Sequence, residues 1–193
     1  MRETILQFGA GRFLRAFVDR FVQEANDAGH DLGKVVVVQT TPGRRAELIG
    51  GDGYPVLIRG IEQGQTIDRV VRVRSISRAM IAAEAWRDVM EVAASPTLTT
   101  IVTNATEAGY QLSPDSQAEA QQPATMPGML TQALFARFCA DGSPLILLPC
   151  ELIERNADKL RGLVAEQASR WKLPAKFVDW ATGSCHWLNN LVD

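Results

Sequence analysis

Short apolar runs alternate along the chain with longer amphipathic stretches. The runs are rich in aliphatic and β-branched residues and predict buried strands; they comprise residues 5–8, 35–38, 99–103 and 145–148. The amphipathic stretches repeat apolar residues at intervals of three and four, as helices that bury one face do; they comprise residues 12–26, 83–94, 130–138 and 160–168. Alternation of strand and helix predicts a doubly wound α/β fold with a mostly parallel sheet.

Residues 54–76 depart from this alternation. Two extended stretches flank the turn-forming residues 62–65, and arginines alternate with valines in the second stretch, as in a half-buried strand. We therefore expect a hairpin-like insertion within the sheet or at its edge. The polar segment 111–127 contains three prolines and is expected to form a loop.

Charge and composition exclude several classes of function. The 20 Lys and Arg residues nearly balance the 22 Asp and Glu residues, which argues against a nucleic-acid partner. The longest aliphatic runs have four residues, far fewer than the roughly 20 that span a bilayer, so no membrane partner is expected. Three cysteines without paired spacing favour a reducing compartment, and the start of the chain lacks a leader-like segment, so a cytoplasmic location is expected. The two histidines are far apart and predict no metal site.

A glycine motif follows the first predicted strand directly and precedes the first predicted helix. The diphosphate of a dinucleotide needs a tight turn there, which Gly9 permits, and a backbone without a Cβ, which Gly11 supplies. Arg12 and Phe13 begin the helix and are candidate cofactor contacts with the two glycines. Leu14 stands where the third glycine of the usual motif would be, so an ordinary strand-to-helix turn remains an alternative.

The second predicted strand ends in Gln39 and Thr40, where an acidic residue would bind the adenosine ribose. Gln39 and Thr40 are the candidate ribose contacts. Arg44 and Arg45 follow and either reach the 2′-phosphate of NADP or lie in solvent. The residues themselves therefore leave the choice between NAD and NADP open.

Two further polar groups follow strands on the other half of the predicted sheet. Asn104, Thr106 and Glu107 come after the strand at 99–103 and are expected near the nicotinamide, unless they only satisfy their own turn. Asn156 precedes the helix predicted after the strand at 145–148, where it is either a helix N-cap or a functional residue.

Segments 5–17, 104–109 and 149–153 resemble the polyol-specific long-chain (mannitol) dehydrogenase family, and the similarity runs through the whole chain in order. The resemblance implies that residues 1–193 form a Rossmann-like NAD(P)-binding domain, to be followed by a helical domain with the catalytic lysine. It implies zinc-independent hydride transfer between NAD and a small-molecule substrate, a sugar acid or a polyol. It also implies that Asn156 stabilises the substrate oxyanion and that Asp193 helps to position the substrate.

Three alternatives remain at this point. The parent protein could act on mannitol or on fructuronate, as other family members do, or the chain could be a non-catalytic dinucleotide-binding module. Because the four lysines of the chain are not followed by the K-x-x-x-x-N-x-x-H pattern of the family, this chain alone is expected to show little turnover.

Overall fold

The computed structural model describes residues 2–49, 52–114 and 121–191. Its main sheet has six strands in the order β5-β2-β1-β6-β7-β8, and every neighbouring pair is parallel. The strands are β1 (Glu3–Phe8), β2 (Lys34–Gln39), β5 (Ile76–Ile81), β6 (Thr100–Thr103), β7 (Ile146–Pro149) and β8 (His186–Trp187). Successive strands are added on one side of β1 and then on the other, so the doubly wound, Rossmann-like fold expected from the sequence is confirmed.

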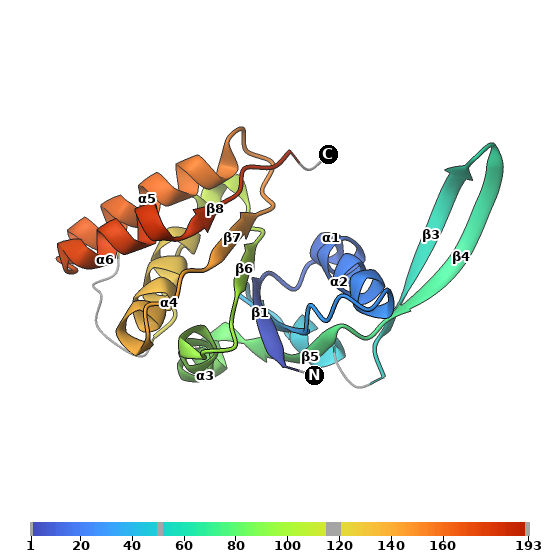
Figure 1. The fold of residues 1–193 in the computed structure, drawn as a ribbon, viewed down its shortest axis with the longest axis horizontal. Helices are drawn as coiled ribbons and strands as arrows, with labels where there is room; N and C mark the ends of the chain where they lie inside the picture. The colour runs from blue at the N-terminus through green and yellow to red at the C-terminus, as the bar shows by residue number, and fades with distance from the viewer. Residues whose placement is uncertain (1, 50–51, 115–120, 192–193) are drawn as a thin grey trace.

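Helices cover both faces of this sheet (Figure 1). One face carries α1 (Arg12–Ala16) and α2 (Val18–Asp27). The other face carries α3 (Ala82–Ala94), α4 (Met126–Ala140), α5 (Asn156–Arg170) and α6 (Ala175–Asp179). Short helical turns lie at η1 (Arg45–Leu48), η2 (Glu107–Gly109) and η3 (Trp180–Ser184). Among the described residues, no helix is long and apolar enough to cross a membrane.

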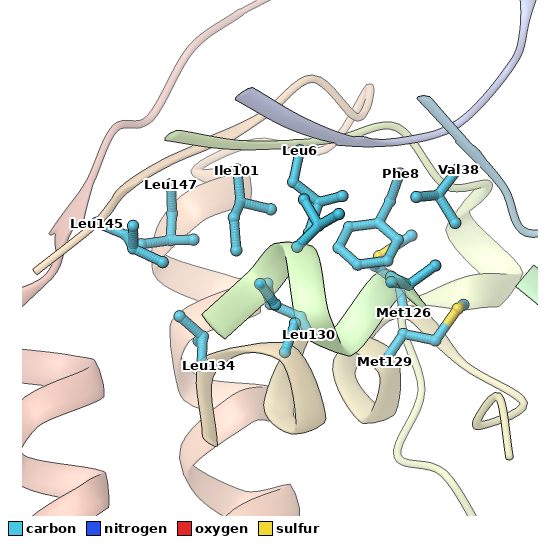
Figure 2. Packing of buried hydrophobic residues seen from close by; sticks show 14 of the residues in the cluster. Leu6, Phe8, Val38, Ile101, Met126, Met129, Leu130, Leu134, Leu145 and Leu147 are labelled. Carbon is cyan, nitrogen blue, oxygen red and sulfur yellow. The ribbon is translucent and has the colours of Figure 1, made fainter. Parts of the chain in front are cut away.

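Alternate residues of β1 feed the two hydrophobic cores, because successive side chains of a strand point to opposite faces. Leu6 and Phe8 pack with residues of α3 and α4, and Figure 2 shows them above Met126 and Leu130. Ile5 belongs to the second core, which includes Leu14 of α1. The next position on that face of β1 is the fully buried Gln7, a polar residue in an apolar core.

The predicted helix at 12–26 is wrong in one respect, because the structure breaks it at Phe17. Phe17 has φ −108° and ψ −82°, and α2 starts at the next residue. At the break, the Arg15 carbonyl accepts a hydrogen bond from the Tyr54 hydroxyl (2.8 Å). A contact from a distant part of the chain therefore replaces a bond within a helix, and the spacing of apolar residues carries no sign of it.

The hairpin expected within 54–76 is present, but its predicted position in or beside the main sheet is wrong. Strands β3 (Tyr54–Glu62) and β4 (Gln65–Val73) pair antiparallel and form a separate two-stranded sheet. In Figure 1 this ribbon extends away from the main sheet beyond α2. The edge position beside β2 is taken by the parallel strand β5, which pairs Met80 with Val38.

The loop predicted at 111–127 is shorter than expected. Met126 and Pro127 already belong to the first turn of α4, where proline is favourable because its missing N–H has no partner in a helix. Residues 115–120 of this segment lie outside the described residues.

Candidate functional site

The turn between β1 and α1 divides two roles between its glycines. Gly9 has φ +133°, and a Cβ there would lie 3.1 Å from Leu14 Cδ1 and 3.3 Å from the Asn104 carbonyl oxygen. Gly9 N also donates to the Val38 carbonyl (2.9 Å), which ties the turn to β2. A Cβ on Gly11 would meet nothing within 4 Å, so its backbone is open to an approaching group. The residues present therefore fit a bound diphosphate, because the turn is tight and its outer backbone is unobstructed.

Arg12 and Phe13 stand at the start of α1, directly after this turn, and both are exposed. The Phe13 ring stacks on Phe17 with centroids 5.1 Å apart. Arg12 lines a hollow of about 310 Å³ whose other walls are Arg15 and the first residues of β3. A cation and an aromatic ring thus border the turn on its outer side.

Gln39 shapes the loop that follows β2. It is 3% exposed, and its Nε2 donates to the carbonyl oxygens of Thr41 (2.9 Å) and Gly43 (2.6 Å). Its Oε1 accepts a hydrogen bond from Ala46 N (2.7 Å). Both amide hydrogens and the amide oxygen are therefore committed to the loop backbone. Gln39 supports the candidate ribose site from beneath, and its own contact with a ribose stays a prediction.

This loop forms one wall of a groove of about 410 Å³ at the carboxyl end of β2. Thr40 and Arg44 line the groove, with Glu84 and Gln122 on the opposite side. The Thr40 carbonyl accepts a hydrogen bond from Gln122 Nε2 (2.9 Å). Arg44 lies between two carboxylates, since Nε donates to Glu47 (2.6 Å) and Nη1 to Glu84 (3.1 Å).

The turn after β6 connects the ends of three strands. Asn104 N donates to the Phe8 carbonyl (3.1 Å) at the end of β1, and Asn104 Nδ2 donates to the Cys150 carbonyl (2.6 Å) after β7. Thr106 is exposed, and its carbonyl accepts a hydrogen bond from Gly109 N (2.8 Å). Glu107 contributes its backbone to η2.

Glu151 supports this turn, a role that the sequence analysis missed. It is 1% exposed and accepts hydrogen bonds from Thr103 Oγ1 (2.7 Å), Ala105 N (3.0 Å) and the Tyr110 hydroxyl (3.0 Å). Burial raises the pKa of Glu151, and these donors lower it. An acidic residue directly after a buried strand was the available signal, because a charge there must find donors.

Cys150, the residue before Glu151, is not suited to nucleophilic chemistry. Burial, and then the charge of Glu151, raise the pKa of its thiol to about 12. Because the thiolate is the reactive form, this side chain is inert at neutral pH.

Asn156 is fully buried at the start of α5. Its Nδ2 donates to the carbonyl oxygens of Pro149 (3.0 Å) and Glu151 (3.1 Å), and its Oδ1 accepts from Asn190 N (3.2 Å). The N-cap alternative is wrong, because Asn156 is the first residue of α5 and Arg155 holds the N-cap position. Asn189 Oδ1 accepts hydrogen bonds from Ala157 N (3.0 Å) and Asp158 N (3.1 Å), and Asn156 Oδ1 accepts a second one from Ala157 N (2.9 Å). The role of Asn156 as an oxyanion donor stays a prediction, and Asp193 lies outside the described residues.

The structure brings the candidate cofactor residues to one edge of the sheet. They follow β1, β2 and β6, and Asn156 follows β7; parallel strands end at the same edge. The order of the strands reverses between β1 and β6, where open α/β sheets bind their ligands. Gly9 and Asn104 meet at this position.

The chain is similar to several proteins named altronate oxidoreductase. It is 37% identical to the altronate oxidoreductase of Halalkalibacterium halodurans and 34% identical to that of Bacillus subtilis, over 99% of this chain in both cases. The match spans only 39% and 41% of those relatives, respectively.

Solved structures share the fold. A substrate-free D-sorbitol dehydrogenase superposes with a TM-score of 0.79 at 19% identity, over 100% of this chain and 43% of that one. A mannitol 2-dehydrogenase from Pseudomonas fluorescens, in a ternary complex with NAD and D-mannitol, gives 0.73 at 23% identity, over 93% and 39%. The family model described as the mannitol dehydrogenase Rossmann domain matches residues 3–193, and the chain therefore belongs to the mannitol dehydrogenase family.

Proposed function

We propose that this chain is the NAD-binding part of a longer oxidoreductase that transfers a hydride between the cofactor and a sugar acid of the altronate/tagaturonate type. The open backbone at Gly11, placed where the strand order reverses, is the observation that carries the cofactor assignment. Relatives named altronate oxidoreductase, similar over 99% of this chain, support the substrate class. The solved relative that contains NAD supports the choice of cofactor.

When bound, NAD would supply the nicotinamide ring that accepts or donates the hydride. The chain's own residues bind and orient it. Gly9 makes the turn, and the amides from Gly11 onward, with Arg12, receive the diphosphate. The groove beside Thr40 receives the adenosine end. The Asn104 carbonyl lies next to Gly9, which supports a position of the turn after β6 near the nicotinamide end.

A preference for NAD over NADP follows from the charges of this groove. Arg44 is the cation best placed to attract a 2′-phosphate, but Glu47 and Glu84 already pair with it. A phosphate would have to displace these carboxylates, and the second of them also lines the groove. The ribose hydroxyls of NAD carry no charge and do not meet this repulsion.

The catalytic assignments extend the proposal to the parent protein. Asn156 would donate to the substrate oxygen after exchanging one of its two backbone acceptors, and Asp193 would help to position the substrate. The general base lysine is expected in the part of the parent that this chain does not include. The unpaired cysteines are consistent with a cytoplasmic enzyme.

Calorimetric titration of this chain with NADH and NADPH tests the cofactor assignment. We expect NADH to bind more tightly than NADPH, and Gly11→Val to weaken NADH binding by about tenfold or more, because its side chain occupies the open approach. Gly162→Val is the matched control, since its Cβ also meets nothing within 4 Å but lies in α5. Equal heats for Gly11→Val and the unmodified chain would refute the assignment.

The substrate class needs the complete gene product. Initial rates with tagaturonate, fructuronate and fructose in the presence of NADH should favour tagaturonate. Higher specificity for fructose or fructuronate would refute the proposed substrate class and assign the protein to another branch of the family.

A further inference from the structure

Polar side chains cross the interior between the glycine turn and the base of the hairpin. Gln7 of β1 donates its Nε2 to the Gly9 carbonyl (3.1 Å). Asp19 of α2 is fully buried and within hydrogen-bonding reach of the Gln7 carboxamide. Its Oδ2 lies 3.1 Å from the hydroxyl of Tyr54, the first residue of β3. These side chains link the proposed cofactor turn to α2 and to the hairpin.

The two hydrogen-bond partners of the Tyr54 hydroxyl favour a proton on Asp19. The Tyr54 hydroxyl is 2.8 Å from the Arg15 carbonyl and 3.1 Å from Asp19 Oδ2, but a phenol has only one proton to donate. If Asp19 is ionised, both neighbours are acceptors and they compete for that proton. If Asp19 is a carboxylic acid, it donates to the Tyr54 oxygen while Tyr54 donates to Arg15, and both short distances become hydrogen bonds.

The surroundings of Asp19 also favour the neutral acid. Asp19 Oδ1 and Gln7 Oε1 are buried acceptors that have no hydrogen bond among the described residues, so donors offset the burial of a negative charge only in part. The Ser75 hydroxyl, just before β5, donates to the Asp19 backbone carbonyl (2.7 Å) and not to the Asp19 carboxylate.

The charged groups around Asp19 do not compensate for its burial. Arg15 of α1 is the cation that acts on it, while Arg20, the next residue of α2, pairs with Glu24 (3.5 Å). Burial raises the pKa of Asp19 to about 7, outweighing the opposite effects of Tyr54, Gln7 and Arg15. Asp19 therefore loses its proton near neutral pH, within the pH range in which many enzymes work.

We propose that Asp19 is a positioning residue for the dinucleotide turn, acting as a neutral carboxylic acid that leaves Gln7 free to hold the Gly9 carbonyl. This inference rests on the proposed cofactor-binding role of that turn. When Asp19 loses its proton to solvent, the carboxylate becomes a stronger acceptor. It then draws the Gln7 amide from Gly9 and the Tyr54 hydroxyl from Arg15, which loosens both the turn and the end of α1. Dinucleotide affinity should therefore fall as Asp19 ionises.

Titrations of the 193-residue chain with NAD between about pH 6 and pH 8.5 test this inference. We expect affinity to fall by about tenfold across this range. Asp19→Asn cannot lose a proton and should give a nearly flat profile. Asp31→Asn is the matched control, because it removes an exposed carboxylate that pairs with Arg2, and it should keep the unmodified profile.

A second variant tests the link to the hairpin. Tyr54 is hydrogen-bonded to Asp19 and acts on its pKa, so Tyr54→Phe should shift the midpoint of the affinity profile. A purely structural role for Tyr54 would change affinity without moving the midpoint.

Infrared difference spectra give a readout that does not depend on the cofactor. The spectrum of the unmodified chain minus that of Asp19→Asn, taken near pH 6, should contain the carbonyl stretch of a protonated carboxyl group. Lack of that band, or tight binding of NAD with a flat profile in the unmodified chain, would overturn the inference and leave the proposed function in place. Lack of NAD binding at every pH would instead overturn the proposed function, and the positioning role with it.

Discussion

Replacing each glycine of the β1–α1 turn by alanine should separate folding from cofactor binding. Gly9→Ala places a side chain at φ +133°, which costs about 1–3 kcal/mol for a residue with a Cβ. The new Cβ would also press on Leu14 Cδ1 at 3.1 Å and on the Asn104 carbonyl at 3.3 Å. Leu14 is fully buried and the carbonyl is backbone, so neither yields easily. We expect a loss of about 3 kcal/mol in the free energy of unfolding.

Gly11→Ala is the matched comparison two residues away. Gly11 has φ −68° and ψ 162°, which alanine adopts without strain, and its Cβ would meet nothing within 4 Å. Alanine is a poorer helix N-cap than glycine, but it restricts the unfolded chain by about 0.4–1 kcal/mol. These two effects nearly cancel, so stability should change by less than about 0.5 kcal/mol.

Urea unfolding of both variants measures the difference, with NADH titration of Gly11→Ala in parallel. Gly9→Ala should lower the midpoint clearly, and its melting temperature should fall by about 2–4 °C for each kcal/mol lost. Gly11→Ala should unfold like the unmodified chain and bind NADH more weakly. Equal midpoints for the two variants would refute the conclusion that Gly9 is held in a conformation that only glycine tolerates.

Three further predictions concern buried groups. Arg137→Met should lower the free energy of unfolding by about 3 kcal/mol, because the guanidinium is in a side chain only 2% exposed and donates to three backbone carbonyls. Arg87→Met, which removes an exposed ion pair, should change it by less than about 0.5 kcal/mol in the same urea assay. Between pH 3.8 and about 7, Asp19 is neutral in the folded chain but ionised in the unfolded chain. The free energy of unfolding should therefore fall by about 4 kcal/mol as pH rises through that window. Asp19→Asn should abolish this pH dependence. If the curves of stability against pH for the variant and the unmodified chain were parallel, the prediction would be wrong. A thiol reagent should modify exposed Cys139 rapidly in the native chain, whereas Cys150, with its raised pKa, should react only after unfolding; fast reaction at Cys150 would contradict its burial.

Part of the candidate site was predictable because its signals are local. The Gly9–Gly11 motif directly follows a strand, and backbone sterics alone determine which residues such a turn accepts. The polar residues after the other strands were predictable for a similar reason, because parallel strands bring their carboxyl ends to one edge. Glu151, by contrast, has its donors in a segment more than 40 residues earlier in the chain, and no local pattern reveals that network.

The sequence by itself determined the alternation of strands and helices, the parallel sheet and the glycine turn, because periodicity and φ/ψ preferences act between near neighbours. Only the tertiary structure decided three other features: the hairpin stands apart from the sheet, the first helix breaks at Phe17, and Asn189 caps α5. It also decided the pKa of Asp19, which burial raises and which Tyr54 and Gln7, from other elements, lower. In each case the decisive partner is a group distant along the chain, brought near only when the cores form.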